Sequence, residues 1–287
     1  MTRQSATARR AEELLGAAVV ATAPVAGGDV CTATRIKLAD GRTVLMKTLA
    51  HPPAGFFEAE ARGLRWLAEA GGAACPPVLA VDTDCVVLPW IETGKPTPDA
   101  AAEFGRRLAT THAAGAAAYG LAQDGFIGRL PLPNATAPTW AEFFVTRRVL
   151  PYLKLARDRG LADEQQAAAV EGVLARVGDL VPDEPPARLH GDLWNGNVLW
   201  GADGHVRLID PAAHGGHRET DLAMLQLFGC PHLDRVLDGY RRHTPLADGW
   251  TARVGLHQLF PLLVHAVLFG RGYAEQALTT ARTALRH

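Results

Sequence analysis

The chain has 287 residues and a formal net charge of −1, and hydrophobic residues make up 48% of it. This length suits two lobes with separate cores, and the interspersed charges produce no basic field of the kind that binds nucleic acid. The four cysteines, Cys31, Cys75, Cys85 and Cys230, form no C-x-x-C pair, which argues against a zinc site or a disulfide framework and favours a reducing cytoplasm.

The first part of the chain predicts one helix followed by β-structure. Residues 1–20 are predicted as an amphipathic helix, and no apolar run approaches the ~18 residues of a membrane span. Residues 30–38 and 43–48 predict a β-hairpin, because the connector between them contains Asp-Gly. A helix over residues 56–70 and two further strands are then expected; these strands span residues 75–81 and 85–88.

The pattern changes after residue 96, where helical periodicity dominates. Helices are predicted over residues 98–118, 139–158, 163–179, 219–229, 232–242 and 249–283. The stretch 121–138 is rich in Gly, Pro and Asn and is predicted to be a loop.

Three polar residues in the second half carry the strongest functional signal. Asn197 follows Asp192 by five residues, and Asp210 follows Asn197 by thirteen. Eukaryotic-type protein kinases place a catalytic Asp, a metal-binding Asn and a metal-binding Asp in this order and spacing. A carboxylate such as Asp192 can orient a hydroxyl and accept its proton, while Asn197 and Asp210 offer the oxygen ligands that magnesium prefers. An ordinary turn would explain His-Gly-Asp alone, but the joint pattern indicates phosphoryl transfer from ATP.

The order of elements agrees with this interpretation. A small β-rich lobe with one helix precedes a larger, mainly helical lobe, which is the layout of the protein-kinase-like fold. We therefore expect an α+β, two-lobed protein with a nucleotide-binding lobe over residues 1–90 and a catalytic and substrate-binding lobe over residues 91–287.

A kinase also needs a lysine that is paired with a glutamate on the next helix. Lys47 ends a predicted strand, and Glu58 and Glu60 both follow on the predicted helix. Glu60 shares the inward helical face with Leu64 and Leu67, so Lys47–Glu60 is the predicted ion pair. The alternative is an exposed lysine and an unrelated surface acid.

Gly27 and Gly28 are the candidates for the turn that covers the phosphates, because glycine lets backbone N–H groups approach phosphate oxygens. The signal is weak, since no G-x-G-x-x-G is present. Cys31 follows this turn and is expected to be a small buried strand residue; a redox-sensitive thiol is the alternative.

The segment 88–91 follows a strand and precedes the change of pattern, so it is the predicted hinge that reads adenine. Leu88 ends the apolar run, Pro89 can supply a carbonyl and Ile91 an N–H. The missing N–H of proline costs nothing at this position.

With these residues placed, the chain resembles the fructosamine kinase (ketosamine 3-kinase) family, a branch of the aminoglycoside/choline-kinase-like phosphotransferases. The resemblance covers about residues 25 to 270 and rests on the segments 57–64, 126–128, 140–144, 190–197, 208–212, 216–224 and 227–229. Two positions depart from the family pattern: Pro89 stands where an acidic residue is usual, and Leu132 stands in place of the usual Gln.

The resemblance implies ATP- and Mg²⁺-dependent phosphorylation of the C3 hydroxyl of a ketosamine, free or protein-bound, in cytoplasmic protein deglycation. Asp192 would orient that hydroxyl. Trp194 would be a platform for the sugar or its amine, or else a packing residue below the loop. His217 and Arg218 would line the substrate mouth or occupy exposed loop positions, and Asp221 would brace the catalytic loop.

Two rival functions stay open at this point. The first is the same chemistry on an aminoglycoside, a choline-like alcohol or an amino sugar. The second is a catalytically silent nucleotide-binding module, which is disfavoured because all five residues of the kinase set are present. The sequence leaves the oligomeric state open.

Overall fold

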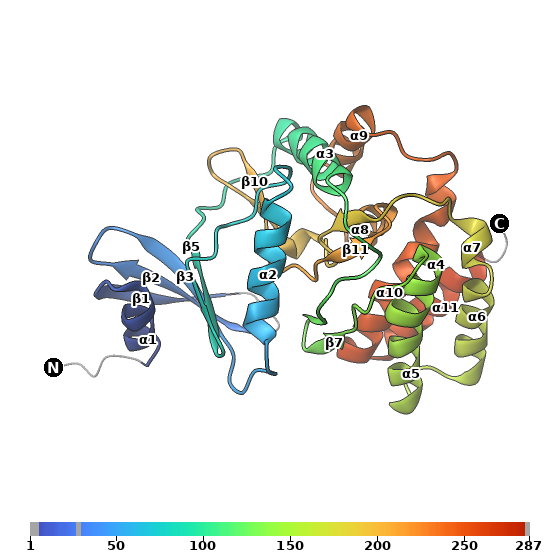
Figure 1. Ribbon diagram of the computed structural model, residues 1–287, viewed down its shortest axis with the longest axis horizontal. Helices are drawn as coiled ribbons and strands as arrows, with labels where there is room; N and C mark the ends of the chain where they lie inside the picture. Colours follow the sequence, from blue (N-terminus) through green and yellow to red (C-terminus); the bar gives the residue numbers. More distant parts are fainter. Residues whose placement is uncertain (1–5, 27–29, 285–287) are drawn as a thin grey trace.

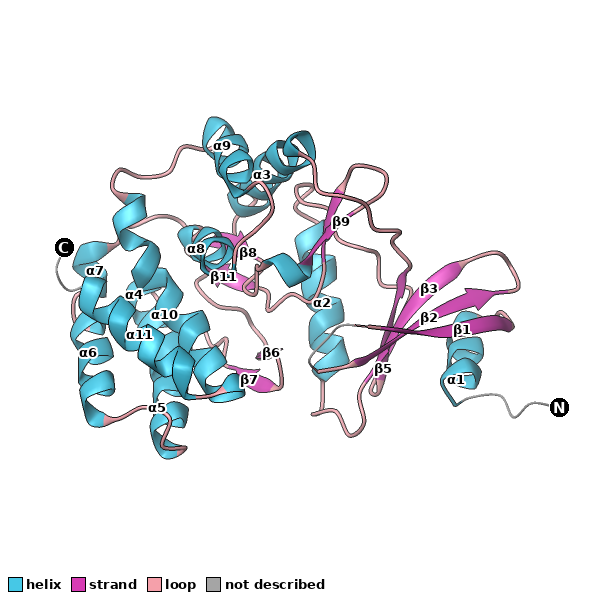
Figure 2. Ribbon diagram, turned by 180° about the vertical axis from the view of Figure 1, so that it is seen from behind, coloured by secondary structure: helices cyan, strands magenta, loops and turns pink. Residues whose placement is uncertain are grey.

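The computed structural model describes residues 6–26 and 30–284 and shows two lobes (Figure 1). The N-terminal lobe is a five-stranded antiparallel sheet in the order β1-β2-β3-β5-β4, accompanied by two helices. Its elements are α1 (Ala6–Leu15), β1 (Val19–Val25), β2 (Thr32–Leu38), β3 (Thr43–Thr48), α2 (Phe56–Ala68), β4 (Ala80–Asp82) and β5 (Cys85–Pro89). In both views α2 lies between the sheet and the helical lobe (Figures 1 and 2). The expectation of an α+β, two-lobed, protein-kinase-like fold is confirmed.

The predicted hairpin is present, and β2 pairs with β3 from Thr32↔Thr48 to Lys37↔Thr43. The predicted helix over residues 1–20 is wrong after Leu15. The helix ends at Leu15, Gly16 takes a positive φ of 66°, and β1 pairs antiparallel with β2. This strand lies at the sheet edge, where Pro24 is tolerated, and most of its side chains are exposed, so it carries no alternating apolar pattern.

The C-terminal lobe is mainly helical, as expected. Its helices are α3 (Pro98–Ala113), α4 (Trp140–Phe143), the π-helix η1 (Phe144–Val149), α5 (Leu150–Asp158), α6 (Glu164–Leu174), α7 (Val177–Leu180), the 3₁₀ turn η2 (Asn195–Asn197), α8 (Glu219–Phe228), α9 (Leu233–His243), α10 (Trp250–Phe269) and α11 (Arg271–Ala284). The predicted helix over 249–283 is divided at Gly270, whose φ of 109° is incompatible with a continuous helix. By length and composition α10 could cross a membrane, but its inward face packs in the core of this lobe.

Three short antiparallel strand pairs interrupt the helices. They are β6 (Gly125–Ile127) with β7 (Leu130–Leu132), β8 (Ala187–Leu189) with β11 (His214–Gly216), and β9 (Val198–Trp200) with β10 (Val206–Leu208). The first pair lies in the stretch predicted as a loop, and the pairing of β8 with β11 has no sequence signal because each strand has three residues. Together, β8 to β11 frame the segment that carries the kinase motif.

The chain crosses between the lobes at two places. After β5, Gly94 N–H donates to Trp200 O at 2.7 Å, so residues 92–94 extend the β9–β10 pair. After α2, Leu208 N–H donates to Ala74 O at 2.8 Å, and Arg107 Nη1 donates to Gly72 O at 2.9 Å. Residues 72–74 therefore belong to the N-terminal lobe by sequence and to the C-terminal lobe by contact.

Candidate active site

The buried carboxylate of Asp221 holds the loop between β8 and η2 in place. Asp221 Oδ2 accepts the His190 backbone N–H at 2.8 Å, and its Oδ1 accepts the Gly191 N–H at 2.9 Å. His112 Nε2 lies 3.1 Å from the same carboxylate. Gly191 has a φ of 82°, and a Cβ there would lie 2.2 Å from Ala212 O, so only glycine fits. Buried hydrogen bonds to a charged group contribute about 1.5–3 kcal/mol each, which makes this loop rigid.

His190 joins this loop to the strand that carries Asp210. Its Nε2–H donates to Ile209 O at 2.8 Å, and its Nδ1 accepts the backbone N–H of Asp192 at 3.2 Å. Burial lowers the pKa of His190, so the ring is neutral and the donor and acceptor roles of its two nitrogens are fixed.

Asp192 and Asn197 face each other across the loop. Asn197 Nδ2 donates to Asp192 O at 2.8 Å and to Asp192 Oδ2 at 3.1 Å, so the amide oxygen of Asn197 is turned away from Asp192. Burial raises the pKa of Asp192 to about 7, and the carboxylates of Asp210 and Asp221 act in the same direction. A carboxyl group with this pKa is suited to proton transfer near neutral pH.

Lys47, Glu60 and Asp210 meet at the junction of the lobes. Lys47 Nζ lies 2.8 Å from both carboxylate oxygens of Glu60 and 2.5 Å from Asp210 Oδ1. The structure thus brings Glu60 to the lysine, and not Glu58. Burial opposes the charge on Lys47, but the carboxylates of Asp210 and Glu60 outweigh it and raise the pKa of Lys47, which stays protonated.

The donor set beside this lysine fits a divalent cation. Asp210 follows β10 with a left-handed φ of 54° and keeps about 40% of its side chain exposed. Its carboxylate and the amide oxygen of Asn197 are hard oxygen ligands of the kind that magnesium binds, and both come from the same strand–turn–strand unit. Roles in metal binding for these two residues remain predictions.

The predicted hinge lies where the sheet ends. Leu88 pairs with Leu45 on β3, and Trp90 N–H donates to Thr43 O at 3.0 Å. Because backbone groups alternate in direction along an antiparallel strand, the carbonyl of Pro89 turns away from β3. Pro89 and Ile91 are therefore the residues of the segment 88–91 whose carbonyl and N–H are not used in pairing with β3.

The predicted phosphate turn at Gly27 and Gly28 lies outside the described residues. Cys31, just after it, is partly buried and precedes β2, so its predicted place in the strand is wrong. Burial raises the pKa of its thiol to about 11. A thiol that is protonated at neutral pH is a slow nucleophile, which favours the packing role over the redox role.

Trp194 is part of the catalytic loop and is half-buried. Its ring packs edge-on against Phe228 at 6.2 Å between centroids, and Phe228 in turn lies 4.5 Å from the ring of His265. Phe228 ends α8 and His265 lies on α10, so sequence spacing could not join them to Trp194. These rings form an aromatic group beside the loop, which is compatible with either role predicted for Trp194.

His217 and Arg218 are not the exposed loop residues that one alternative predicted. His217 is 1% exposed, and burial lowers its pKa to about 3. Arg218 makes two hydrogen bonds to Glu184, at 2.6 and 2.7 Å. In this structure both side chains are therefore occupied within the protein; their contact with substrate remains a prediction.

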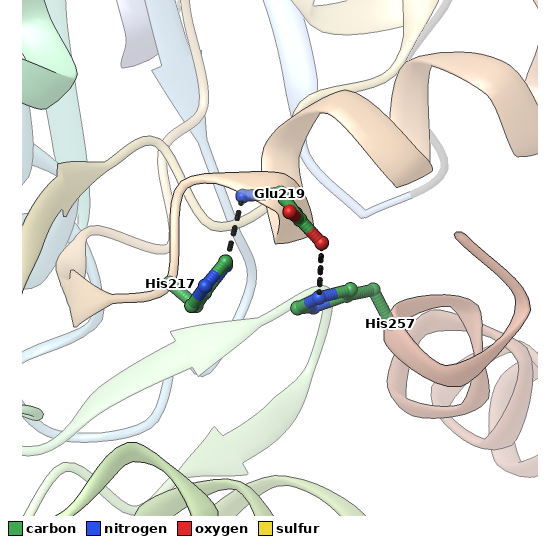
Figure 3. A group of neighbouring side chains, drawn as sticks. All are labelled: His217, Glu219 and His257. Atoms are coloured by element: carbon green, nitrogen blue, oxygen red, sulfur yellow. Dashed lines mark hydrogen bonds and ion pairs between the residues drawn. The ribbon is translucent and has the colours of Figure 1, made fainter. Parts of the chain in front are cut away.

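His217 belongs to a buried cluster with Glu219 and His257 (Figure 3). One potential ligand atom of each residue lies within 4.8 Å of the others. However, Arg253 binds the Glu219 carboxylate through two hydrogen bonds, at 2.6 and 2.9 Å. His217 Nδ1 accepts the Glu219 backbone N–H at 3.2 Å, as the dashed line in the figure shows.

These contacts argue against a metal ion in the cluster. A neutral His217 that accepts at Nδ1 carries its proton on Nε2, whereas a metal-bound histidine normally donates from its second nitrogen. Arg253 already balances the charge of Glu219, so a dication would add two uncompensated buried charges. The cluster instead anchors the first turn of α8, where Thr220 Oγ1 lies 3.0 Å from His257 Nδ1. The adjacent residue of α8, Asp221, is the brace of the catalytic loop.

The site lies between a β-rich lobe and a helical lobe. It combines the Lys47–Glu60 pair, the loop residue Asp192, and the side-chain oxygens of Asn197 and Asp210. This combination defines the chain as a protein-kinase-like phosphotransferase. An aminoglycoside phosphotransferase, solved as a ternary complex with AMP-PNP and hygromycin B, has the same fold, with a TM-score of 0.63 at 18% identity over 99% of this chain and 98% of its own.

The comparisons narrow this class to one family. The family model described as fructosamine kinase matches residues 3–287. A Thermus thermophilus protein named "Probable ketoamine kinase" is 39% identical over 253 residues, which is 87% of this chain and 88% of that protein. A Thermobifida fusca crystal structure named for fructosamine-3-kinase is 48% identical, with a TM-score of 0.94 over 98% of this chain and 99% of that one. The chain belongs to the fructosamine kinase family, and it is an ATP-dependent phosphotransferase that acts on a sugar hydroxyl.

Proposed function

We propose that this enzyme transfers the γ-phosphoryl group of ATP to the C3 hydroxyl of a ketosamine, the adduct of a sugar and an amine. One observation carries the proposal: Lys47 contacts both Glu60 and Asp210, residues that lie far apart in the chain, beside the loop that holds Asp192. This is the arrangement that phosphoryl transfer requires, because the protein contributes mainly position and charge.

In this proposal Asp192 orients the acceptor hydroxyl and takes its proton. The hydroxyl oxygen forms a bond to the γ-phosphorus while the bond between that phosphorus and the β–γ bridging oxygen breaks, and ADP leaves. Asn197 and Asp210 would hold magnesium, which supplies charge neutralisation of the phosphates when bound. Lys47, kept protonated and directed by Glu60, contacts the phosphate oxygens.

The nucleotide base would be read at the end of the sheet. The carbonyl of Pro89 accepts from the exocyclic amine of adenine, and the N–H of Ile91 donates to the ring. Leu88 packs below the base as part of the buried apolar cluster of the N-terminal lobe. Pro89 departs from the family pattern, but it is compatible with this recognition of adenine, because only the backbone carbonyl of Pro89 is used.

The acceptor would lie against Trp194. A ketosamine carries a secondary amine that is cationic near neutral pH, and an aromatic face attracts a cation by about 0.5–2 kcal/mol. Phosphorylation at C3 makes the adduct unstable, so that it breaks down and releases the amine. The biological role that follows is deglycation of free or protein-bound amines in the cytoplasm.

The proposal is tested with purified enzyme, Mg²⁺-ATP and fructose-lysine, ribulose-lysine or erythrulose-lysine, with an aminoglycoside and choline as competing acceptor classes. We expect ADP release with a ketosamine and a product whose ³¹P–¹H coupling places phosphate at C3. The Asp192→Asn variant is the matched control, because it keeps the side-chain size and the hydrogen-bonded loop. Turnover of the aminoglycoside or choline with none of the ketosamines would refute the acceptor class, and phosphate at another hydroxyl would refute the C3 assignment.

A further inference from the structure

The β6–β7 hairpin belongs to the C-terminal lobe by sequence but contacts the N-terminal lobe. Phe126 packs on Phe56 of α2, with 5.2 Å between ring centroids, and joins the apolar cluster of that lobe. Arg62, also on α2, donates from Nη2 to Asp124 O at 3.3 Å. The hairpin is therefore a bridge across the cleft on the side of α2.

The other side of the hairpin is fixed in the C-terminal lobe. Leu132 is fully buried, and Tyr152 Oη donates to Pro131 O at 2.7 Å. At the turn Gly128 has a φ of 54°, and a Cβ there would lie 3.1 Å from Leu268 Cδ1. The backbone at the tip of the hairpin is thus fixed against the C-terminal lobe. The backbone of Arg129, the residue after Gly128, is fixed with it.

The side chain of Arg129 donates from Nη2 to Val30 O at 3.0 Å. Val30 comes directly after the predicted phosphate turn, whose own residues lie outside the described part of the chain. Arg129 is exposed, and within residues 6–26 and 30–284 the contact with this carbonyl is its one hydrogen bond. Most of its five N–H donors are therefore available to a ligand.

Arg129 is one of the charged groups that act on Cys31. Burial has the largest effect on the pKa of this thiol and raises it. Four charged groups also act on the thiol: the cations Lys47 and Arg129 and the carboxylates of Glu60 and Asp210. Arg129 and Lys47 therefore both lie within electrostatic range of one residue, Cys31, which follows the predicted phosphate turn.

The charges at this end of the cleft do not suit a polyphosphate without a further cation. Lys47 contributes one positive charge, and Asp210 and Glu60 offset it, although burial raises the pKa of Glu60 to about 7. The contacting trio therefore offers no net positive charge to a phosphate. Magnesium-bound ATP is itself anionic. A guanidinium matches phosphate oxygens with two parallel N–H donors, and an arginine that stabilises the transferring phosphoryl group is a recurring device in phosphoryl transfer.

We propose that Arg129 binds the polyphosphate of ATP from the C-terminal lobe, moving from the Val30 carbonyl to the phosphate oxygens when nucleotide enters. The inference rests on the ATP site of the proposed function. It gives the hairpin a role in that site beyond packing, since the hairpin carries a cation that reaches the N-terminal lobe at Val30.

Equilibrium binding of AMP, ADP and AMP-PNP to the wild type and to Arg129→Gln tests this proposal. We expect affinity for ADP and AMP-PNP to fall about tenfold, as for the loss of one charge-assisted hydrogen bond, while affinity for AMP stays unchanged. Arg129→Lys should recover part of the loss, because the charge remains. Arg147→Gln is the matched control: Arg147 donates to a single backbone carbonyl, Ala135 O, at 3.3 Å, and should leave all three affinities unchanged.

Two results would overturn the proposal. Equal weakening of all three nucleotides in Arg129→Gln would show that the hairpin only holds the lobes together, and unchanged affinities would show that Arg129 stays on Val30. The binding measurement needs no acceptor, so a wrong acceptor class would leave its result intact. Failure of the wild type to bind AMP-PNP would instead refute the proposed ATP site.

Discussion

The raised pKa of Asp192 predicts that the enzyme loses activity on the acidic side of neutrality. A base must be ionised to accept a proton, and burial with two neighbouring carboxylates raises the pKa of Asp192 to about 7 in the free enzyme. Below that pH the carboxyl is protonated, so activity must rise with pH. For a pKa near 7, roughly one molecule in eleven is ionised at pH 6 and about ten in eleven at pH 8, which predicts a loss of about tenfold in kcat/KM.

The assay is the rate with Mg²⁺-ATP and acceptor both well below their KM values, between pH 5.5 and 8.5, because this rate reports the ionisation of the free enzyme, to which the pKa of about 7 belongs. ATP and the acceptor amine also titrate, so the profile is compared with the residual rate of Asp192→Asn, which shares both ionisations and lacks the carboxyl. We expect the ratio of the two rates to follow a single ionisation near pH 7. A ratio that is flat between pH 6 and 8, or a midpoint below pH 5, would refute the assignment of Asp192 as a catalytic base with a raised pKa.

Three further predictions concern other parts of the site. Glu60→Gln should raise KM for ATP roughly tenfold, since Lys47 loses one of its two anionic partners, and Glu58→Gln on the same helix should leave KM unchanged; equal effects would contradict the pairing. Asp210→Asn keeps a residue type that tolerates a left-handed backbone, so the fold should persist while kcat falls about 10²–10³-fold and the Mg²⁺ concentration for half-maximal rate rises; full activity would exclude a metal role. Trp194→Ala should raise KM for the ketosamine about five- to tenfold with KM for ATP unchanged, and Trp194→Phe should restore most of it; a parallel rise in both KM values would indicate a packing residue.

Local patterns predicted the parts of the site that depend on one element. Helical periodicity alone distinguished Glu60 from Glu58, because only one of them lies on the apolar face of α2. The spacing of Asp192, Asn197 and Asp210 identified one strand–turn–strand unit. In the structure its strands are β9 and β10, and the 3₁₀ turn η2 precedes β9. Each of these inferences uses neighbours within a few turns or strands of the chain.

What could not be predicted depends on contacts between distant segments. The β1 strand, with four alanine, threonine or proline residues at its centre, has no apolar alternation, and it exists because β2 offers an edge. Phe228 and His265 approach Trp194 only after α8 and α10 pack together, and their individual sequence contexts are those of core helices. Arg129 lies in a segment that was predicted to be a loop, and only the pairing of β6 with β7 directs it across the cleft.

The two crossings of the chain between the lobes, at residues 72–74 and 92–94, limit how the lobes can move. A body held at one point can rotate about any axis through that point, whereas a body held at two points rotates only about the line that joins them. Rotation about that line would open and close the cleft. The β6–β7 hairpin is a third contact between the lobes, on the side of α2, so opening must also release Phe126 from Phe56 and Asp124 from Arg62. Nucleotide can enter and leave while the lysine of one lobe and the aspartate of the other return to the same alignment at every turnover.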